Sequence, residues 1–277
     1  MNYEQLFQNE LNRVLIDLSR VDLYKYRAYR QLRLEGFYPE SGVSNIDIKE
    51  LAIGECPKIR PFDYTLKGDM IISLSREAYR IYNEYWLGTK GAYKKEEFSP
   101  YVIFDRYESD YILYKLGKID QLREDSEIFT LFRDAGYIVK TGYKYGGIFR
   151  IYGLNYKRDS REHSKYIFNI NRVLNSIELQ RIVRVTEGVN KIPIFPYRKT
   201  NKRYREQFTM RKNDYYGIYV FGENSKIDLS MVVDSAILNR RKPLVTIVDR
   251  EGDILRLDIE LLKLRDKYFI AIYRNRS

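Results

Sequence analysis

The stretch FRDAGYIVKTGYKYGGIFRIYGLNYKRDSREHSKYIF, residues 132–168, decides the expected fold of this 277-residue chain. It predicts a helix that ends at Gly136, a strand in YIVKT, a glycine turn, a strand in GIFRIY, a polar loop and a third strand beginning at SKYIF. A helical pattern, IELQRIVRVTEGVN, follows and leads into Lys191 and the apolar IPIF. Tyr152, His163 and Lys191 each fall at the end of an expected element, where a compact sheet could bring them together.

The charge of the chain favours a polyanionic partner. Lysine and arginine number 49 against 38 aspartates and glutamates, which gives a formal net charge of +11 and a pI near 9.4. Such a surface steers polyanions in from solution. Charge alone leaves RNA, DNA and anionic lipid open, while 44% apolar residues are enough for a globular protein with real cores.

Several kinds of chemistry are disfavoured by composition. His163 and Cys56 are the only histidine and the only cysteine, too few for a zinc site of the common kinds or for an internal disulfide. A carboxylate-held magnesium ion stays formally open. There is no GxxxxGK[ST] motif, and GYKYGG lacks the GxGxxG spacing, so we expect no nucleotide cofactor. No run approaches 18 apolar residues and the N-terminus has no signal-peptide core, which predicts a cytoplasmic protein away from membranes.

A repeat with an offset of one hundred residues runs through the first half of the chain. FRDAGYIVKTG at 132–142 echoes LRLEGFYPESG at 32–42, with both glycines in register, which indicates a duplicated helix-and-strand unit. Residues 1–35 read as a helix with leucines at helical spacing, 37–72 as short strands, and Ser75 as the N-cap of a helix running up to Gly88. The clearest strands are expected in KPLVTIVDREGDILRLDIELLKLRDKYFIAIY near the C-terminus.

The opening stretch resembles the catalytic domain of the tRNA-splicing (tRNA-intron) endonucleases of archaea and eukaryotes. Their pattern is GxxVKxGxKFGxxFxxY, then HSxxLV, then RxAxxxxK, and three blocks match here in order. The resemblance implies an α+β (mixed α/β) chain with the tRNA-endonuclease fold. It also implies a catalytic triad at Tyr152, His163 and Lys191, and the family's arginine seven residues before the lysine falls on Arg184.

The implied chemistry suits these residue types. Cutting RNA without a metal requires removal of a 2′-OH proton, stabilisation of the phosphorane charge and protonation of the leaving 5′-oxygen. The resemblance implies Tyr152 as base, His163 as acid and Lys191 as electrostatic clamp. A histidine has a pKa near neutrality, whereas a tyrosine needs neighbouring cations to act as a base. Lys144, Arg150, Lys157, Arg158 and Arg161 are near enough in sequence to contribute. Tyr156 is an alternative closer to His163.

A second segment competes for the lysine. VVDSAILNRRKPLVTIVDREGDILRL resembles the same family's RxAxxxRKxLxxAVVDEEGDxxYY segment and would make Arg241 or Lys242 the catalytic residue. We favour a second, partial copy of the fold, because Ser235 stands where the arginine is expected and no second Tyr or His motif precedes it. Which lysine completes the site stays open at this point.

The expected architecture has a small N-terminal helix-and-strand unit, a catalytic α/β unit with a mixed sheet, and a partial C-terminal repeat. The boundaries we predict are 1–100 for the N-terminal unit, 101–197 for the catalytic unit, 198–212 for a basic linker or loop, and 213–277 for the pseudocatalytic half-unit. The loop is either a solvated connection or a direct RNA contact.

The resemblance implies a metal-independent archaeal endoribonuclease that excises introns from precursor tRNA at bulge-helix-bulge sites, leaving 2′,3′-cyclic phosphate and 5′-OH ends. It also implies a homodimer, joined partly through the acidic loop of Asp249, Glu251 and Asp253. Arg184 and Arg256 are the candidates for gripping a bulged base. The alternative is a non-catalytic structural subunit or RNA-binding protein of the same fold.

Overall fold

The computed structural model describes residues 2–15, 18–19, 21–90, 100–154, 156 and 163–275, which form two lobes. Lobe 1 comprises Met1–Leu51, Lys144–Gly146 and Ile167–Ser277, and lobe 2 comprises Ala52–Tyr143 and Gly147–Tyr166. Helices and a large mixed sheet confirm the expected α+β class. The four predicted segment boundaries stay predictions, because a division by compact packing does not test family units.

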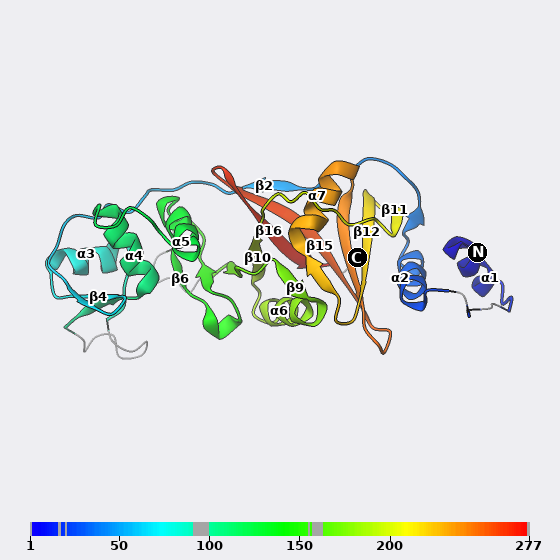
Figure 1. The fold of residues 1–277 in the computed structure, drawn as a ribbon, viewed down its shortest axis with the longest axis horizontal. Helices are drawn as coiled ribbons and strands as arrows, with labels where there is room; N and C mark the ends of the chain where they lie inside the picture. The colour runs from blue at the N-terminus through cyan, green and yellow to red at the C-terminus, as the bar shows by residue number, and fades with distance from the viewer. Residues whose placement is uncertain are drawn as a thin grey trace. The chain divides into compact units, whose positions relative to one another are not determined.

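Lobe 1 is built on a mixed sheet with strand order β1-β11-β12-β14-β15-β16-β10-β8, to which β2 adds alongside β15 (Figure 1). The strands are β1 (Tyr38–Pro39), β2 (Ile48–Glu50), β8 (Tyr166–Phe168), β10 (Ile192–Pro196), β11 (Phe208–Arg211), β12 (Tyr215–Gly222), β14 (Lys242–Val248), β15 (Ile254–Leu264) and β16 (Lys267–Arg274). The pairs β12–β14 and β2–β15 are parallel, whereas β11–β12, β14–β15, β15–β16 and β16–β10 are antiparallel. The strands expected near the C-terminus are confirmed.

Helices cover both faces of this sheet. Successive residues of a strand point to opposite faces, so each strand contributes side chains to two hydrophobic cores. The helices are α1 (Tyr3–Leu11), α2 (Leu23–Leu34), α6 (Ser176–Gly188) and α7 (Leu229–Asn239). Tyr219 and Val245 pack with side chains of α6 and α7, whereas their neighbours Ile218 and Leu244 pack with side chains of α1 and α2. The sheet of lobe 1 is therefore the middle of three layers.

The described residues of lobe 2 form a small antiparallel sheet, three helices and a hairpin. Its elements are β3 (Thr65–Lys67), β4 (Met70–Ser73), α3 (Arg76–Tyr85), β5 (Val102–Phe104), α4 (Arg106–Lys115), α5 (Glu124–Asp134), β6 (Val139–Thr141) and β7 (Phe149–Ile151). The Tyr107 and Phe149 rings meet edge to face at 4.7 Å, with Phe129 beside both. The hydroxyl of Ser75 accepts the Ala78 N–H at 3.1 Å, which confirms it as a helix N-cap.

The single helix expected over residues 1–35 is wrong, because two helices occupy this stretch. Helix α1 ends before Asn12, and Arg13 adopts a left-handed backbone with φ 57°. A new N-cap follows at Asp22, whose carboxylate accepts the Lys25 N–H. Leu15 is fully exposed, so the regular leucine spacing does not correspond to one buried helical face.

The repeat at an offset of one hundred residues is confirmed in the local structure. Both α2 and α5 end in a left-handed glycine, Gly36 with φ 87° and Gly136 with φ 85°. The next residue, Phe37 or Tyr137, donates its N–H back five residues to Leu32 or Phe132, at 3.0 Å in each case. Arg33 and Arg133 each donate a guanidinium N–H to the carbonyl of that aromatic residue.

The similarity continues into later elements and defines two copies of one motif. Copy A consists of α5, β6, β7, β8, β9 (Val173–Asn175), α6 and β10. Copy B consists of α2 and β1 together with β11, β12, β13 (Lys226–Asp228), α7 and β14. Copy B is therefore discontinuous in sequence, because all of copy A lies between β1 and β11. The stretch 213–277, predicted to be a partial copy, contains β12, β13, α7 and β14 of copy B, whereas α2, β1 and β11 lie before it in the sequence.

Strand register aligns the first hairpins of the two copies. Val139 pairs with Ile151 in copy A, and Pro39 pairs with Met210 in copy B. The offset of one hundred makes residues 39 and 139 equivalent, so Ile151 corresponds to Met210. The next position, Tyr152 in copy A, is Arg211 in copy B.

The second helices of the copies also begin and end alike. Asn175 and Asp228 are the N-caps of α6 and α7, and β9 pairs with β13 about the Leu174–Ile227 pair, as a pseudo-two-fold relation requires. At the other end, left-handed Asn190 or Arg240 follows the helix. The residue after it donates its N–H back five residues, from Lys191 to Thr186 and from Arg241 to Ala236. Lys191 therefore corresponds to Arg241.

The two glycine turns offer a matched test of this packing. We expect Gly36→Ala to lower the free energy of unfolding by about 1–2 kcal/mol, because only the left-handed backbone is strained and no atom lies within 4 Å of the new Cβ. Gly136→Ala should cost clearly more, because its Cβ would lie 2.9 Å from the Gly54 backbone. Hydrogen exchange followed by mass spectrometry reports each lobe separately, and equal losses for the two variants would contradict this packing.

Candidate active site

Tyr152 follows strand β7 in lobe 2 and is almost completely buried, with 5% of its surface exposed. Its backbone N–H donates to the Ile138 carbonyl at 2.9 Å, which extends the β6–β7 hairpin by one residue. The Arg150 guanidinium lies 5.8 Å from the centre of the Tyr152 ring. Arg150 is thus one of the predicted neighbouring cations that does approach this tyrosine.

His163 is exposed and stands three residues before β8. The Lys165 N–H donates to the Ile151 carbonyl at 2.8 Å, so the backbone that carries His163 pairs with the backbone that carries Tyr152. Three of the cations suggested for this site, Lys157, Arg158 and Arg161, lie outside the described residues. Within lobe 2, chain pairing brings the two segments of the proposed acid and base together.

An aromatic cluster surrounds Tyr152. The rings of Tyr152 and Tyr156 lie 4.4 Å apart, and Trp86 packs on both, at 5.4 Å from Tyr152 and stacked at 5.5 Å on Tyr156. Trp86 and Tyr156 are half-buried, whereas Tyr152 is enclosed. Tyr152 and Tyr156, the two candidates for the base, therefore lie side by side in one aromatic cluster, and the Trp86 ring packs against both.

A buried ion pair between Lys140 and Glu108 lies against the Trp86 ring of this aromatic cluster. The Lys140 ammonium donates to the Glu108 carboxylate at 2.7 Å and to the Gly88 carbonyl at 2.9 Å, and lies 5.3 Å from the Trp86 ring centre. Burial lowers the pKa of Lys140, opposed by Glu108. Asp105 caps α4 by accepting the N–H groups of Tyr107 and Glu108. Burial and the nearby Glu108 charge raise the pKa of Asp105 to about 7.

Lys191 lies in lobe 1, directly before β10, and only 7% of its surface is exposed. It lines a cavity of about 200 Å³ formed by the end of α6, residues 190–193 and the end of β16. Glu187 and Arg274 form an ion pair of 3.4 Å at the same cavity. Strand β10 lies beside β8 in the sheet, and just after β8 the Asn169 N–H donates to the Ile194 carbonyl of β10 at 2.9 Å. Strand β8 follows His163 in the sequence.

The two predicted RNA-contacting arginines have different surroundings within lobe 1. Arg184 projects from α6, is exposed, and has no ion pair with any residue that the structure describes. Arg256 lies on β15, pairs with Glu35, and has 13% of its side chain exposed. Burial lowers its pKa, and Asp258 opposes that shift. RNA contact by either arginine stays a prediction, and Arg256 would have to exchange a carboxylate for a phosphate.

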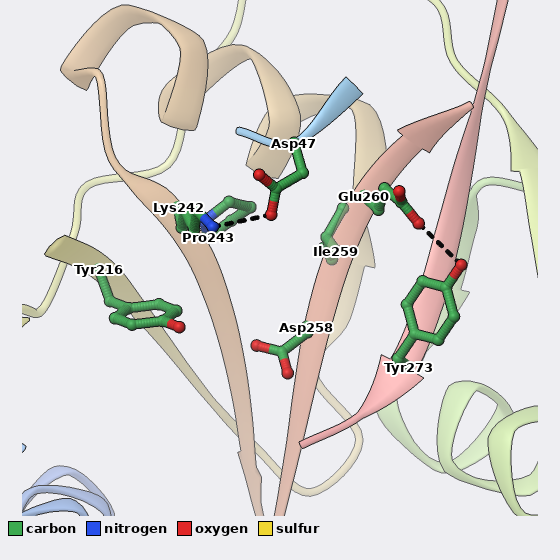
Figure 2. Close-up of a pocket in the computed structure, with 8 residues that line it drawn as sticks. All are labelled: Asp47, Tyr216, Lys242, Pro243, Asp258, Ile259, Glu260 and Tyr273. Atoms are coloured by element: carbon green, nitrogen blue, oxygen red, sulfur yellow. Dashed lines mark hydrogen bonds and ion pairs between the residues drawn. The ribbon is translucent and has the colours of Figure 1, made fainter. Parts of the chain in front are cut away.

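The rival lysine, Lys242, occupies a different pocket of lobe 1 (Figure 2). Its ammonium lies 2.9 Å from Asp47, the ion pair drawn in Figure 2. It also lies 2.9 Å from Asp214, and although burial opposes the shift, the two carboxylates together raise the pKa of Lys242. Asp258 and Glu260 from β15 face the same pocket of about 340 Å³. Arg241, the other residue suggested by this segment, also forms an ion pair, at 2.6 Å from Glu206.

The acidic loop expected to join partner chains is a tight turn between β14 and β15. The Asp249 carboxylate accepts the N–H groups of Gly252 and Asp253, at 2.8 Å each. Gly252 takes the left-handed backbone that the turn requires, with φ 94°. Asp249 thus has a local role in lobe 1, and contact with a partner chain stays a prediction.

Two supporting residues of the candidate site were missed by sequence reasoning. Trp86 is the only tryptophan and lies just before Gly88 at a helix end, but nothing local connects it to Tyr152. Lys140 belongs to the VKTG motif, where the absence of an acidic neighbour in the sequence concealed its pairing with Glu108.

In the described part of the chain, no cluster of three or more His, Cys, Asp or Glu side chains is arranged to hold a metal ion. None of the described helices is both long and apolar enough to span a membrane.

Comparison with known proteins shows what the part of the chain that contains this site is similar to. Residues 122–206 match the model of the family described as tRNA intron endonuclease, catalytic C-terminal domain. This part of the chain, which contains Tyr152, His163 and Lys191, is therefore similar to a catalytic domain. More particularly, the chain is similar to proteins of archaea that are named tRNA-splicing endonuclease.

Three relatives carry the name tRNA-splicing endonuclease. The protein of Methanothermobacter thermautotrophicus is 31% identical over 102 residues, which is 28% of this chain and 59% of the relative. That of Thermococcus onnurineus is 29% identical over 156 residues, covering 54% of this chain and 81% of the relative. That of Methanopyrus kandleri is 36% identical over 69 residues, covering 23% and 37%. The chain thus spans less than two thirds of two of these three relatives.

The raised pKa of Asp105 predicts a pH-dependent stability of lobe 2. Between about pH 4 and 7 the folded carboxyl holds its proton while the unfolded one has lost it, so its contribution to stability falls as pH rises. Asp105→Asn keeps an N-cap but cannot ionise. Relative to wild type, the variant should gain about 1 kcal/mol of unfolding free energy per pH unit across this window. Urea unfolding at several pH values measures this difference, and a constant difference would contradict the buried, proton-holding carboxyl.

Proposed function

We propose that the chain is a metal-independent tRNA-intron endonuclease that cuts precursor tRNA at bulge-helix-bulge sites. The observation that carries the proposal is that the two copies have different residues at equivalent positions. Copy A keeps the family's residue types at Tyr152, His163 and Lys191, whereas copy B has Arg211 and Arg241 at two equivalent positions. The family match over residues 122–206 covers copy A and supports the same assignment.

The proposed reaction is a transesterification within the RNA. Tyr152 takes the proton of the 2′-OH, and the resulting oxygen attacks the adjacent phosphorus. Lys191 offsets the extra negative charge of the phosphorane, and His163 gives a proton to the 5′-oxygen as the bond to phosphorus breaks. The products are a 2′,3′-cyclic phosphate and a 5′-OH end. No oxidant or further reactant is required.

Two structural features favour Lys191 over Lys242 as the clamp. Lys191 follows the left-handed turn at the end of α6 and precedes the strand that borders β8, the continuation of the His163 segment. Lys242 already has two carboxylate partners at 2.9 Å, which offset the charge that a phosphorane would need. An ammonium paired in this way is suited to hold the chain segments of Asp47 and Asp214 together.

We further propose a homodimer, because one catalytic copy per chain gives a dimer two sites for the two cuts of a bulge-helix-bulge RNA. Arg184 is the better placed of the two predicted base-gripping residues, since its guanidinium is exposed. Planar arginine side chains stack on extruded bases, which is how irregular RNA is commonly recognised. Light scattering of the purified protein tests the dimer directly.

The proposed roles predict a graded set of cleavage rates. With enzyme in excess over a bulge-helix-bulge RNA in EDTA, His163→Ala should cut at least about 100-fold more slowly than wild type, because the leaving oxygen loses its acid. Lys191→Ala should fall by a similar order, as expected for loss of a charge contact to the transition state. Lys242→Ala is the matched control and should cut within a few-fold of wild type.

Each alternative has its own outcome in this assay. A large loss for Lys242→Ala with little for Lys191→Ala would overturn the proposed site. Tight RNA binding by wild type with no cutting in any buffer would favour a non-catalytic RNA-binding subunit. Cutting that EDTA abolishes would indicate a metal-dependent nuclease. Analysis of the RNA ends separates hydrolysis from the proposed transesterification.

A further inference from the structure

A strongly basic segment connects β10 to β11 in lobe 1. The basic segment is defined here as residues 198–205, RKTNKRYR, which carry five cationic side chains, all exposed. Four of them form no ion pair with a carboxylate in the described parts of the chain: Lys199, Lys202, Arg203 and Arg205. A high density of exposed, unneutralised cations is what phosphate-rich polymers bind.

This segment is attached to helix α7 at several points. The Asp234 carboxylate accepts the Tyr197 hydroxyl and the Thr200 N–H, at 2.6 Å each. The Ser235 hydroxyl accepts the Tyr204 N–H at 2.9 Å, and the Ser230 hydroxyl accepts the Arg198 N–H at 3.2 Å. Three neighbouring side chains of one helix thus hold the backbone at the start, middle and end of the segment.

Two tyrosines hold the ends of the segment in the lobe. The Tyr197 ring lies against Tyr268, and its N–H donates to the Tyr268 carbonyl at 3.0 Å. The Tyr204 ring lies edge to face with Phe221, and its hydroxyl accepts the Asp228 N–H at 3.0 Å. The connection therefore has a defined path, unlike a freely solvated linker.

A defined path changes the energetics of binding. An ordered row of cations loses less conformational freedom when it meets a phosphate chain than a flexible linker would, because the backbone is already fixed. The anchors bond almost entirely to main-chain groups and one tyrosine hydroxyl, which leaves the basic side chains directed to solvent. Such an arrangement presents charge without neutralising it.

We propose that the basic segment is a phosphate-backbone binding site for the RNA substrate, held in place by Ser230, Asp234 and Ser235 of copy B. That the polyanion is RNA rests on the proposed function. The proposal also accounts for Asp234, the structural equivalent of Arg184: because Lys191 corresponds to Arg241, Asp234 lies seven residues before the equivalent position in copy B. In copy B this helix face holds the basic segment.

Neutralising the segment tests the charge. Lys199→Ser/Lys202→Ser/Arg203→Ser, made in a His163→Ala background so that no RNA is cut, should bind a bulge-helix-bulge RNA at least ten-fold more weakly at 150 mM salt. The log–log dependence of affinity on salt should become shallower by about 2–3. Lys67→Ser/Arg76→Ser/Lys118→Ser removes the same charges from exposed positions of lobe 2 and should change affinity by less than three-fold. Equal losses for both triple variants would overturn the proposal.

Removing the anchor tests the ordering and has the opposite electrostatic sign. Asp234→Ala raises the formal net charge from +11 to +12, so charge alone would tighten RNA binding. The proposal instead expects weaker binding, by about five-fold, together with faster trypsin cutting within residues 198–205. Ser235→Ala, a milder change, should shift both measurements in the same direction, which keeps the test valid if Asp234→Ala unfolds. Unchanged or tighter binding by a folded anchor variant would overturn the anchoring role.

The readouts separate this proposal from the proposed nuclease activity. In the His163-containing background, the segment variants should keep the wild-type cutting rate at saturating enzyme and lose only affinity. Wild type that binds RNA through the segment but does not cut would refute the nuclease and leave the binding site standing. Binding to anionic lipid vesicles that exceeds binding to RNA at equal salt would assign the segment to a membrane surface instead.

Discussion

The hairpin of β15 and β16 is the interaction on which lobe 1 depends. β15 pairs with β14 of copy B, and β16 pairs with β10 of copy A, so a single hairpin completes the sheet of both copies. Its inward side chains, including Leu257, Ile270 and Ile272, lie in the same core as α6 and α7. Each such fully buried side chain contributes roughly 1.5–3 kcal/mol. The parts of copies A and B that lie in lobe 1 are therefore joined through buried strands, and neither part could unfold without exposing the other.

This joint arrangement leaves the two copies free to diverge in chemistry. Both need the left-handed helix-end turn and the strand that follows it, because those features position β10 and β14 against the hairpin. The residue just after the turn differs between the copies: it is Lys191 in one copy and Arg241, paired with Glu206, in the other. A duplicated frame with a single set of reactive residue types is the physical basis of the proposed function.

The sequence was sufficient to predict those helix ends, caps and strands that depend on neighbouring residues alone. The glycine-ended helices at 36 and 136, the Ser75 cap and the C-terminal strands follow from turn residues, capping side chains and alternation, and each is confirmed. The break between α1 and α2 was missed because leucines continued at helical spacing beyond Asn12. The completion of copy B by α2 and β1 was beyond local reading, since Tyr38 and Arg211, which pair across it, are 173 residues apart. The same holds for Trp86 against Tyr152, a contact made by packing within lobe 2.

The central claim is that copy A alone performs the chemistry, and a structure with bound RNA tests it most directly. A precursor RNA with a 2′-deoxy nucleotide at the cleavage position lacks the attacking hydroxyl and should bind without being cut. The account predicts that the scissile phosphate lies within hydrogen-bonding distance of His163 and Lys191, with Tyr152 facing the 2′ position. A scissile phosphate held instead by Arg211, Arg241 or Lys242 would contradict it.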